Sequence, residues 1–178
     1  DHCVICVCDE GKENLIASGI ADSKMKVIYN GIEPSEKLRD NKTDGVFRML
    51  LLARFAREKG LDFLIEALAR LKQKTDKAFT CTICGETRTK TLPRTGGKKL
   101  PSIGGEGELF GEIRKLAEEK GVSENLITPG FTTETEKYLW DSNLYLNTSR
   151  SGEAMSFAIL EAMNAGLPVV APDVGGNK

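Results

Sequence analysis

Short apolar runs alternate with amphipathic helical patterns along most of this chain, and this alternation restricts the fold more than any other feature. The run Phe47–Ala53 is apolar at nearly every position, as expected for a strand of a parallel sheet whose two faces are covered by helices. After Gly60, an apolar stripe recurs at spacings of three and four, at Leu61, Leu64, Ile65, Leu68 and Leu71. This spacing predicts an amphipathic helix that follows the strand.

The same strand–helix unit recurs toward the C-terminus. Further strands are predicted at Phe79–Cys84, Leu126–Thr128, Leu144–Leu146 and Val169–Pro172. One helix carries Leu109, Ile113, Leu116 and Ala117 on one face and ends at Gly121, and another has its N-cap at Thr132 or Thr133 and reaches Trp140. Repeated β–α units predict an α/β fold with a doubly wound, Rossmann-like parallel sheet. Ligands of such sheets bind beyond the carboxyl ends of the strands.

The N-terminal part has a different pattern. Val4–Cys8 and Val27–Ile32 are short β runs, and the second is stopped by the turn signal Asn30-Gly31. Residues 34–45 are polar and indicate a linker. The chain begins within a strand-like run and ends soon after Gly175-Gly176 without a closing helix, so we expect a fragment of a longer protein.

Length and charge exclude several classes of protein. A chain of 178 residues fits one domain, or one domain with a piece of another. The 25 basic residues nearly balance the 26 acidic ones, so no overall field favours nucleic acid as a partner. No apolar run is long enough for a bilayer span, and no signal peptide is recognisable. We expect a soluble, cytoplasmic protein, with a peripheral position at the inner face of the membrane left open for the full-length protein.

The cysteines have the spacing of zinc ligands but not the expected surroundings. Cys3 and Cys6 form one pair two residues apart, and Cys81 and Cys84 form another. Both pairs lie in strand-like runs, where residues three apart point to opposite faces. We therefore expect no metal site and interpret the cysteines as reduced, buried, small hydrophobic residues. A zinc-bound structural module is the alternative.

A polar and basic segment at residues 87–107 interrupts the β–α pattern. It contains Gly96-Gly97-Lys98-Lys99 and Gly104-Gly105. Loops of this length inside a compact domain are usually functional or mobile. A mobile solvent loop is the preferred interpretation, and contact with an acceptor or a membrane surface is the alternative.

Two glutamates eight positions apart surround the predicted start of an apolar helix, at Glu153 and Glu161. A helix N-terminus offers unpaired N–H groups and a positive dipole end, which suit an anion such as a diphosphate. If the whole span were helical, the two residues would lie roughly 12 Å apart along the axis. Glu161 stands in an otherwise apolar segment, where an unpaired carboxylate is costly to bury. A hydroxyl-rich ligand is therefore an attractive partner, and an outward-facing side chain is the alternative.

Arg54 and Lys59 flank the loop between the first strand of the sheet and its helix. Two cations on such a loop can neutralise a pyrophosphate, and an arginine can bind it through two hydrogen bonds. Arg57 and Glu58 lie between them, so a solvated basic loop is the alternative. The position of the pair at a strand end, like that of Glu153, favours one shared site.

These residues together closely resemble the family 4 retaining glycosyltransferases, also called glycosyl transferase group 1. The resemblance rests on Glu153 with Glu161, the run Ala162–Val170, the run Asp173–Asn177, Arg54 with Lys59-Gly60, and Tyr29–Ile32. It implies the two-domain GT-B architecture, with residues 46–178 as the second, nucleotide-sugar donor-binding domain. Residues 1–33 then resemble the last elements of the acceptor domain and the hinge, and the rest of the acceptor domain is missing.

The resemblance also implies roles for individual residues. Arg54 and Lys59 match the pair that binds the donor diphosphate and stabilises the leaving group, and Glu153 matches the acid near the transferred sugar. Glu161 matches the acid that holds the ribose hydroxyls. Backbone contacts to sugar and phosphate are implied for Met155, Ser156 and Phe157, and proximity to the nucleobase for Gly130 and Phe131. Catalysis is thereby assigned to Arg54, Lys59 and Glu153.

The implied activity is transfer of a sugar from a UDP-, GDP- or ADP-sugar, with retention of configuration and no metal. The acceptor implied is a glycan or a lipid-linked glycan. The fragment alone is expected to bind donor with little or no turnover. The segment 87–107 departs from the family's shorter turn, and Gly105-Glu106-Gly107 is a candidate for the displaced turn element.

Other functions have less support. A binding-only nucleotide-sugar module without transfer activity is the main alternative. A dinucleotide-dependent oxidoreductase is disfavoured because no Gly-x-Gly-x-x-Gly follows the first strand. A hydrolase with a serine–histidine pair is disfavoured because His2 is the only histidine.

Overall fold

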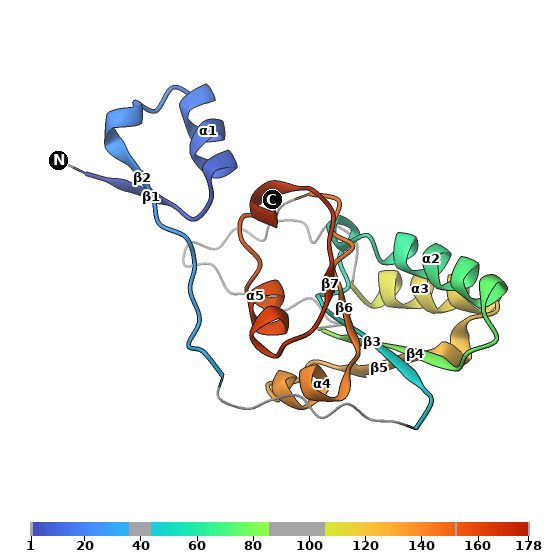
Figure 1. Ribbon diagram of the computed structural model, residues 1–178. Helices are drawn as coiled ribbons and strands as arrows, with labels where there is room; N and C mark the ends of the chain where they lie inside the picture. The colour runs from blue at the N-terminus through green and yellow to red at the C-terminus, as the bar shows by residue number, and fades with distance from the viewer. Residues whose placement is uncertain (1, 36–43, 86–105, 152, 178) are drawn as a thin grey trace.

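The computed structural model describes residues 2–35, 44–85, 106–151 and 153–177. Among these residues, five parallel strands form one sheet in the order β5-β4-β3-β6-β7. The strands are β3 (Phe47–Leu52), β4 (Phe79–Cys84), β5 (Leu126–Gly130), β6 (Leu144–Leu146) and β7 (Val169–Val170). Figure 1 shows this sheet, and the α/β fold with a doubly wound parallel sheet is confirmed.

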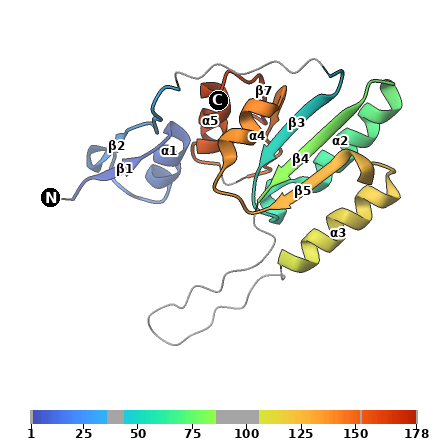
Figure 2. The same cartoon turned by 90° about the horizontal axis from the view of Figure 1, so that it is seen from below.

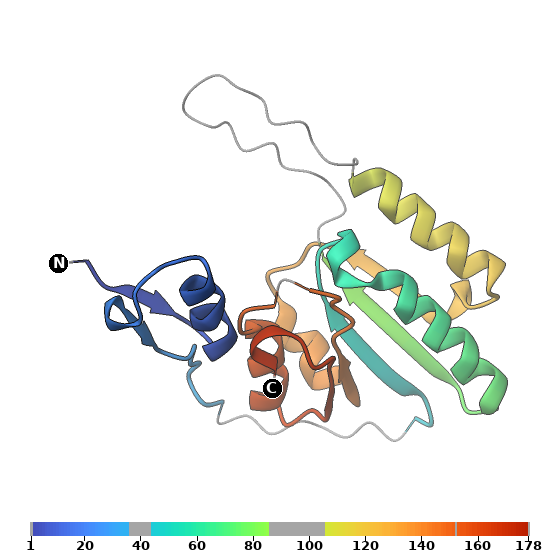
Figure 3. The ribbon, with the colours of Figure 1, turned by 90° about the horizontal axis from the view of Figure 1, so that it is seen from above.

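Helices cover both faces of this sheet. One face carries α2 (Leu61–Lys74) and α3 (Glu106–Glu119), and the other carries α4 (Thr135–Asp141) and α5 (Phe157–Asn164). The separation of the two helix pairs is visible in Figure 3. Short 3₁₀ turns lie at Arg57–Lys59, Ser123–Asn125 and Gly175–Asn177.

The apolar run in β3 explains this two-sided packing. Met49 and Leu51 belong to the core shared with α2 and α3, whereas Leu50 between them belongs to the core shared with α4 and α5. Successive residues of a strand point to opposite faces, so a strand covered on both sides needs apolar side chains throughout. Leu50 is completely buried, which is consistent with the central position of β3 in the sheet.

The cysteines in β4 follow the same alternation. Cys81 belongs to the core on the α2 and α3 side, and Cys84 belongs to the core on the other side. Burial raises the pKa of the Cys81 thiol to about 12. Burial also raises the pKa of Cys84, to about 11, although Lys137 opposes this shift. Cys6 and Cys8 are buried as well, but Cys3 is exposed, so the expectation of burial was wrong for Cys3.

The N-terminal residues form a separate small β–α–β unit. It consists of β1 (Val4–Cys6), α1 (Asp9–Ala17) and β2 (Met25–Val27), with a 3₁₀ turn at Asp22–Lys24 before β2. The two strands pair in parallel and form their own sheet. Figure 2 shows this unit beside the main sheet, with α1 turned toward the C-terminal part of the chain. Contacts between α1 and the turn Gly175–Asn177 join the two parts.

Several element boundaries differ from the sequence-based predictions. β2 ends at Val27, so the predicted run to Ile32 was wrong beyond its first residue. β5 continues past the predicted end at Thr128 to Gly130, which pairs with Cys84 across an irregularity in the ladder. The strands predicted at Val4–Cys8, Phe47–Ala53 and Val169–Pro172 end earlier, at Cys6, Leu52 and Val170.

The predicted start of α4 was also wrong. This helix begins at Thr135 with Glu134 at the N-cap, and no side chain caps it there. The Thr132 hydroxyl instead accepts a hydrogen bond from the Glu134 N–H at 3.0 Å. A threonine can bond to the backbone two residues later in a turn, which competes with N-capping.

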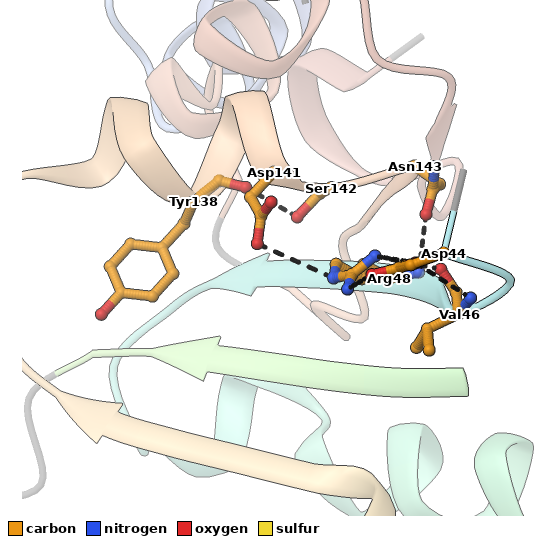
Figure 4. A network of polar contacts seen from close by, with 7 residues as sticks. All are labelled: Asp44, Val46, Arg48, Tyr138, Asp141, Ser142 and Asn143. Carbon is orange, nitrogen blue, oxygen red and sulfur yellow. Dashed lines mark hydrogen bonds and ion pairs between the residues drawn. The ribbon is translucent and has the colours of Figure 1, made fainter. Parts of the chain in front are cut away.

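A polar network around Arg48 links the amino ends of β3 and β6, as Figure 4 shows. The Arg48 guanidinium donates to Asp44 and lies 3.7 Å from an Asp141 oxygen. Asn143 bonds the Arg48 backbone twice, accepting from its N–H and donating its own N–H to the carbonyl, each at 2.7 Å. Ser142 donates to the Tyr138 carbonyl at 2.7 Å. This network lies at the opposite ends of the strands from the predicted site.

The predicted polar segment 87–107 lies mostly outside the described residues, as does most of the linker 34–45. α3 begins at Glu106, so the candidate turn at Gly105-Glu106-Gly107 overlaps the start of a helix. Whether it is a displaced turn element stays a prediction, because Gly105 lies outside the described residues.

Candidate functional site

Two of the predicted site residues, Lys59 and Glu153, lie together at the carboxyl ends of β3 and β6. Lys59 follows β3, Glu153 follows β6, and the Lys59 ammonium forms an ion pair with Glu153 Oε1. Both side chains are largely buried, at 19% and 8% exposure. Adjacent parallel strands end at the same edge of a sheet, which is why residues 94 positions apart can pair.

Glu153 has further partners that fix its charge. The Ser149 hydroxyl, on a residue only 3% exposed, donates to the same carboxylate oxygen. Burial by itself would raise the pKa of Glu153, but the hydrogen bonds from Lys59 and Ser149, the Lys59 charge and Asn147 together lower that pKa below its ordinary value. The carboxylate is therefore ionised at neutral pH and acts as a hydrogen-bond acceptor rather than as an acid.

The loop that carries Lys59 is fastened to the loop after β6. Gly60 adopts φ +60, and a Cβ atom there would lie 2.2 Å from the Thr148 carbonyl oxygen. The Thr148 hydroxyl donates to the Lys59 carbonyl, and the Arg150 N–H donates to the Glu58 carbonyl, each at 2.7 Å. The two loops therefore hold the ion pair between them.

Two glycines hold the backbone of Glu153 from the other side. A Cβ atom on Gly175 would lie 1.4 Å from the Glu153 carbonyl oxygen, and one on Gly176 would lie 1.7 Å from the Ala154 carbonyl oxygen. The Gly176 N–H donates to the Glu153 carbonyl at 3.2 Å. The sequence did not predict this close packing of Gly175 and Gly176 against the segment of Glu153, which depends on the tertiary structure.

Arg54 does not share the environment of Lys59. Its guanidinium lies 3.3 Å from Glu58 Oε1, and its side chain is 58% exposed. One of the two cations predicted to share a site is thus held in a buried pair, whereas the other lies at the surface. A salt bridge this exposed contributes little to stability, so Arg54 can change partners at small cost.

The start of α5 lies beside the ion pair. The helix begins at Phe157, and the N-cap residue Ser156 makes no side-chain capping bond. The first-turn N–H groups of a helix have no acceptors within the helix. A small cavity of about 30 Å³ is lined by Ser156 together with Lys59 and Glu153. Glu153 precedes the helix by four residues and Glu161 lies within it, so the two glutamates lie on either side of the helix start, as the sequence predicted.

Glu161 opens on a different cavity. This cavity of about 230 Å³ is lined by Glu161 together with Glu136, Trp140 and Asn164. Burial raises the pKa of Glu161, and the neighbouring Glu136 carboxylate raises it further. The two glutamates thus have opposite environments. Tyr145, which is buried, lies near both: burial raises the pKa of its hydroxyl, and the charges of Glu153 and Glu161 add to this shift.

The remaining predicted residues occupy separate positions. Gly130 has φ +86 and its carbonyl accepts from the Gly85 N–H at 3.0 Å, so it lies at the carboxyl end of β5. Phe131 follows with 69% of its surface exposed, and Phe157 is 52% exposed. Met155 contacts the N-terminal part of the chain: its carbonyl accepts from Asn30 Nδ2 at 3.1 Å.

A larger cleft adjoins Glu153 and was not predicted from the sequence. It has a volume of about 580 Å³ and lies between the start of α1 and the segments after β6 and β7. Its walls include Cys8, Glu10, Gly11 and Asn14 on one side, and Arg150, Ser151, Glu153, Ala154 and Asp173–Gly175 on the other. Only the fold brings these segments together, because they are separated by most of the chain.

Within the described residues, no group of three or more histidine, cysteine, aspartate or glutamate side chains is arranged to hold a metal ion. The described helices also include none that is both long and apolar enough to cross a membrane.

Comparison with known proteins identifies the family. Residues 34–178 match the family model described as glycosyl transferases group 1. The chain belongs to this family. It is 28% identical over 169 residues to an uncharacterized glycosyltransferase of Methanocaldococcus jannaschii, and 29% identical over 175 residues to the amylovoran biosynthesis glycosyltransferase AmsK of Erwinia amylovora. These alignments cover 87% and 93% of this glycosyltransferase chain. They cover only 38% of each relative, so the chain spans well under half of their length.

The fold of this glycosyltransferase chain is shared with solved structures. The crystal structure of Anabaena HepE in complex with UDP and glucose superposes with a TM-score of 0.76 at 23% identity. The superposition covers 98% of this chain and 45% of HepE. The predicted resemblance to glycosyl transferase group 1, with the Rossmann-like half of a GT-B fold, is confirmed.

Proposed function

We propose that this chain is the nucleotide-sugar-binding part of a glycosyltransferase that transfers a sugar with retention of anomeric configuration. The observation that carries the proposal is the Lys59–Glu153 pair, held between the loops after β3 and β6 and beside the start of α5. It combines a fixed cation, a fixed carboxylate and a helix N-terminus at the sheet edge where α/β proteins bind ligands.

The proposed donor is a UDP-sugar, with GDP- and ADP-sugars as alternatives. HepE, which shares the fold, was crystallised with UDP and glucose. In our proposal the diphosphate binds to Lys59 and to the backbone N–H groups of Ser156 and Phe157 at the helix start. Arg54, which is exposed and weakly paired, turns from Glu58 toward the phosphates.

The transferred sugar is proposed to contact Glu153. This carboxylate is ionised because Lys59 and Ser149 hydrogen-bond to it. It can therefore accept hydrogen bonds from sugar hydroxyls and fix the position of the ring. Glu153 also lines the 580 Å³ cleft, which provides room for a sugar beyond the diphosphate.

Leaving-group departure places negative charge on the nucleoside diphosphate. Fixed positive groups stabilise such a charge most effectively when they need no rearrangement during the reaction. Lys59 and the α5 N-terminus are fixed in this sense by the Gly60–Thr148 packing and by the helix itself. We propose that they stabilise the leaving group, with Arg54 as the movable third positive group.

Glu161 is proposed to hold the ribose hydroxyls. Its pKa is raised by burial and by Glu136, which indicates a carboxylate short of hydrogen-bond donors. A diol supplies two donors and would lower the free energy of the ionised form. Gly130 and Phe131, at the end of β5, are proposed to lie near the nucleobase.

The acceptor is proposed to enter the 580 Å³ cleft on the side formed by α1. We propose that residues 1–33 are the end of an acceptor domain and hinge, residues 34–45 a linker, and residues 46–178 the donor-binding domain. A glycan or lipid-linked glycan acceptor would then be held mainly by parts of the protein beyond this chain. The chain alone is expected to bind donor with little turnover, in the cytoplasm or at the inner face of the membrane.

Calorimetric titration of the chain with UDP, GDP, ADP and their glucose conjugates tests the proposal. We expect one nucleotide to bind, and Arg54→Ala and Glu161→Ala to weaken that binding about 5- to 10-fold. Arg70→Ala, on an exposed position of α2, is the matched control and should bind as wild type. If wild type and both site variants bind equally well, the site assignment is wrong.

A turnover assay, rather than the titration, separates the alternative of a binding-only module. Both functions predict donor binding, but only a transferase predicts hydrolysis or transfer once the rest of the protein is present. Release of UDP from UDP-glucose by the full-length protein, lost in Lys59→Ala, supports transfer. Donor binding by the full-length protein without any release of UDP supports the binding-only module.

A further inference from the structure

The segment between β2 and the linker is fastened to both ends of α5. At the helix start, the Asn30 N–H contacts Met155 Sδ at 3.2 Å, and Asn30 Nδ2 donates to the Met155 carbonyl at 3.1 Å. At the helix end, Asn164 Nδ2 donates to the Glu33 carbonyl, and Asn164 Oδ1 accepts from the Ser35 N–H, each at 2.9 Å. The segment therefore lies along α5 with a contact point at either end.

The contact at Asn164 uses one side chain to bind two backbone groups. Its amide donates to one residue and accepts from the residue two positions later. This is the pattern that an adjacent strand offers to an extended chain. A shorter side chain at residue 164 could form neither bond, and an aspartate could form only the bond to Ser35, because a carboxylate has no hydrogen to donate.

The same helix carries Glu161 one turn before Asn164. Both residues line the 230 Å³ cavity, whose lining also includes Ile32, Glu33 and Ser35. Residues three apart on a helix lie on one face. A ligand held at Glu161 would therefore lie beside Asn164 and the backbone groups of Glu33 and Ser35 that it binds.

We infer that Asn164 is a positioning residue that couples the donor site to residues 30–35. Ligand binding at Glu161 then stabilises the hydrogen bonds of Asn164 to this segment. The segment in turn holds Glu161 in the position that binds the ligand. This inference rests on the proposed function, since it places a donor ribose at Glu161. Coupling between two sites is reciprocal, so loss of the Asn164 contact weakens nucleotide binding by the same factor by which nucleotide strengthens the contact.

The first test needs no nucleotide. Amide exchange of Ser35 is followed by NMR in the whole chain, comparing wild type with Asn164→Ala and Asn164→Asp. We expect exchange about 5-fold faster in Asn164→Ala, as for the loss of one hydrogen bond, and close to wild type in Asn164→Asp. Asn125→Ala is the matched control, because Asn125 Nδ2 also donates to a backbone carbonyl, that of Phe79, at 2.9 Å. Equal Ser35 exchange in Asn164→Ala and in the control overturns the inference.

The second test adds UDP. In wild type we expect saturating UDP to slow Ser35 exchange about 5-fold, and Asn164→Ala to bind UDP about 5-fold more weakly, whereas Asn125→Ala binds as wild type. UDP binding with unchanged Ser35 exchange overturns the coupling and leaves the proposed function standing. Failure of UDP, GDP and ADP to bind wild type overturns both. If Asn125→Ala loses as much UDP affinity as Asn164→Ala, the loss reflects lower stability of the protein, and the coupling is also overturned.

Discussion

Lys59 and Glu153 form an ion pair that joins the loop after β3 to the loop after β6. The pair is nearly closed to solvent, and Ser149 adds a hydrogen bond to the same carboxylate oxygen. A diphosphate that binds Lys59 must therefore compete with Glu153 for the ammonium group. Lys59 is therefore expected to contribute to phosphate binding, whereas Glu153 is expected to oppose it, a difference that the sequence could not predict.

Glu153→Gln is expected to tighten UDP binding while it weakens sugar binding. The glutamine keeps an acceptor for Ser149 but gives Lys59 no charge, so the ammonium is free for phosphate. A hydrogen bond between charged groups is worth about 1.5 kcal/mol or more, so UDP should bind at least roughly 10-fold more tightly. The Glu153→Gln variant should bind UDP-glucose no more tightly than UDP, because the contact of Glu153 with the sugar is lost. Weaker binding of UDP itself, measured by calorimetry, would show that Glu153 contacts the nucleotide directly.

The two glutamates should give opposite pH dependences of stability. The folded-state pKa of Glu153 is lowered, so the stabilisation it provides is present above its ordinary value of 4.5 and is lost as the pH falls below that value. The folded-state pKa of Glu161 is raised, so its contribution falls as the pH rises from 4.5 through the folded-state pKa.

Glu161→Gln and Glu153→Gln test this difference in urea unfolding at pH 4 and pH 7. Glu161→Gln should gain stability relative to wild type on going from pH 4 to pH 7, and Glu153→Gln should lose it. Parallel behaviour of the two variants would contradict the assignment of opposite environments.

Gly175→Ala should destabilise the protein and impair sugar binding. The added Cβ atom would lie 1.4 Å from the Glu153 carbonyl oxygen, which forces the backbone of residues 153–154 to move. We expect a loss of more than about 2 kcal/mol in the free energy of unfolding. Gly121→Ala is the control, since Gly121 also has a positive φ but has nothing within 4 Å of the added Cβ.

The control should lose only about 1 kcal/mol, the strain of a left-handed residue. It should also keep the binding of UDP-glucose. A loss as small in Gly175→Ala as in Gly121→Ala, measured by urea unfolding, would show that the turn at Gly175 can move away from Glu153 without consequence.

Arg48→Ala should lower stability without changing nucleotide binding. Arg48 links Asp44 and Asp141 at the amino ends of the strands, whereas the proposed donor site lies at the carboxyl ends (Figure 4). Its side chain is 21% exposed, and its ion pairs are partly solvated. We expect a loss of about 1 kcal/mol in the free energy of unfolding. A change in UDP affinity of more than about 2-fold would indicate that the two ends of the sheet are coupled.

Local pattern was enough to predict the sheet and most of its strands. The apolar run of β3 required two covered faces, and the alternation of Met49, Leu50 and Leu51 between two cores confirms it. The boundaries were less predictable where a tertiary contact decided them. Gly130 continues β5 because Cys84 is there to pair with it, and α4 starts late because Thr132 bonds within a turn instead of capping the helix.

Residue chemistry at strand ends was also enough to predict that Lys59 and Glu153 would lie at one edge of the sheet, because parallel strands place their carboxyl ends together. The sequence could not predict how the charges pair. It treated Arg54 and Lys59 as equivalent cations, whereas Lys59 is buried with Glu153 and Arg54 lies at the surface beside Glu58. Pairing depends on side-chain distances of a few ångströms between segments that spacing along the chain does not relate.

The sequence by itself therefore determined the α/β fold, the family and the edge of the sheet that carries the candidate site, because these follow from hydrophobic periodicity and from residues at fixed spacing. Only the tertiary structure decided that Glu161 faces a different cavity from Glu153, and that Asn164 binds the backbone of Glu33 and Ser35. The charge and position of these side chains depend on their burial and on contacts between segments far apart in the sequence. Short sequence patterns predict neither the burial nor the contacts.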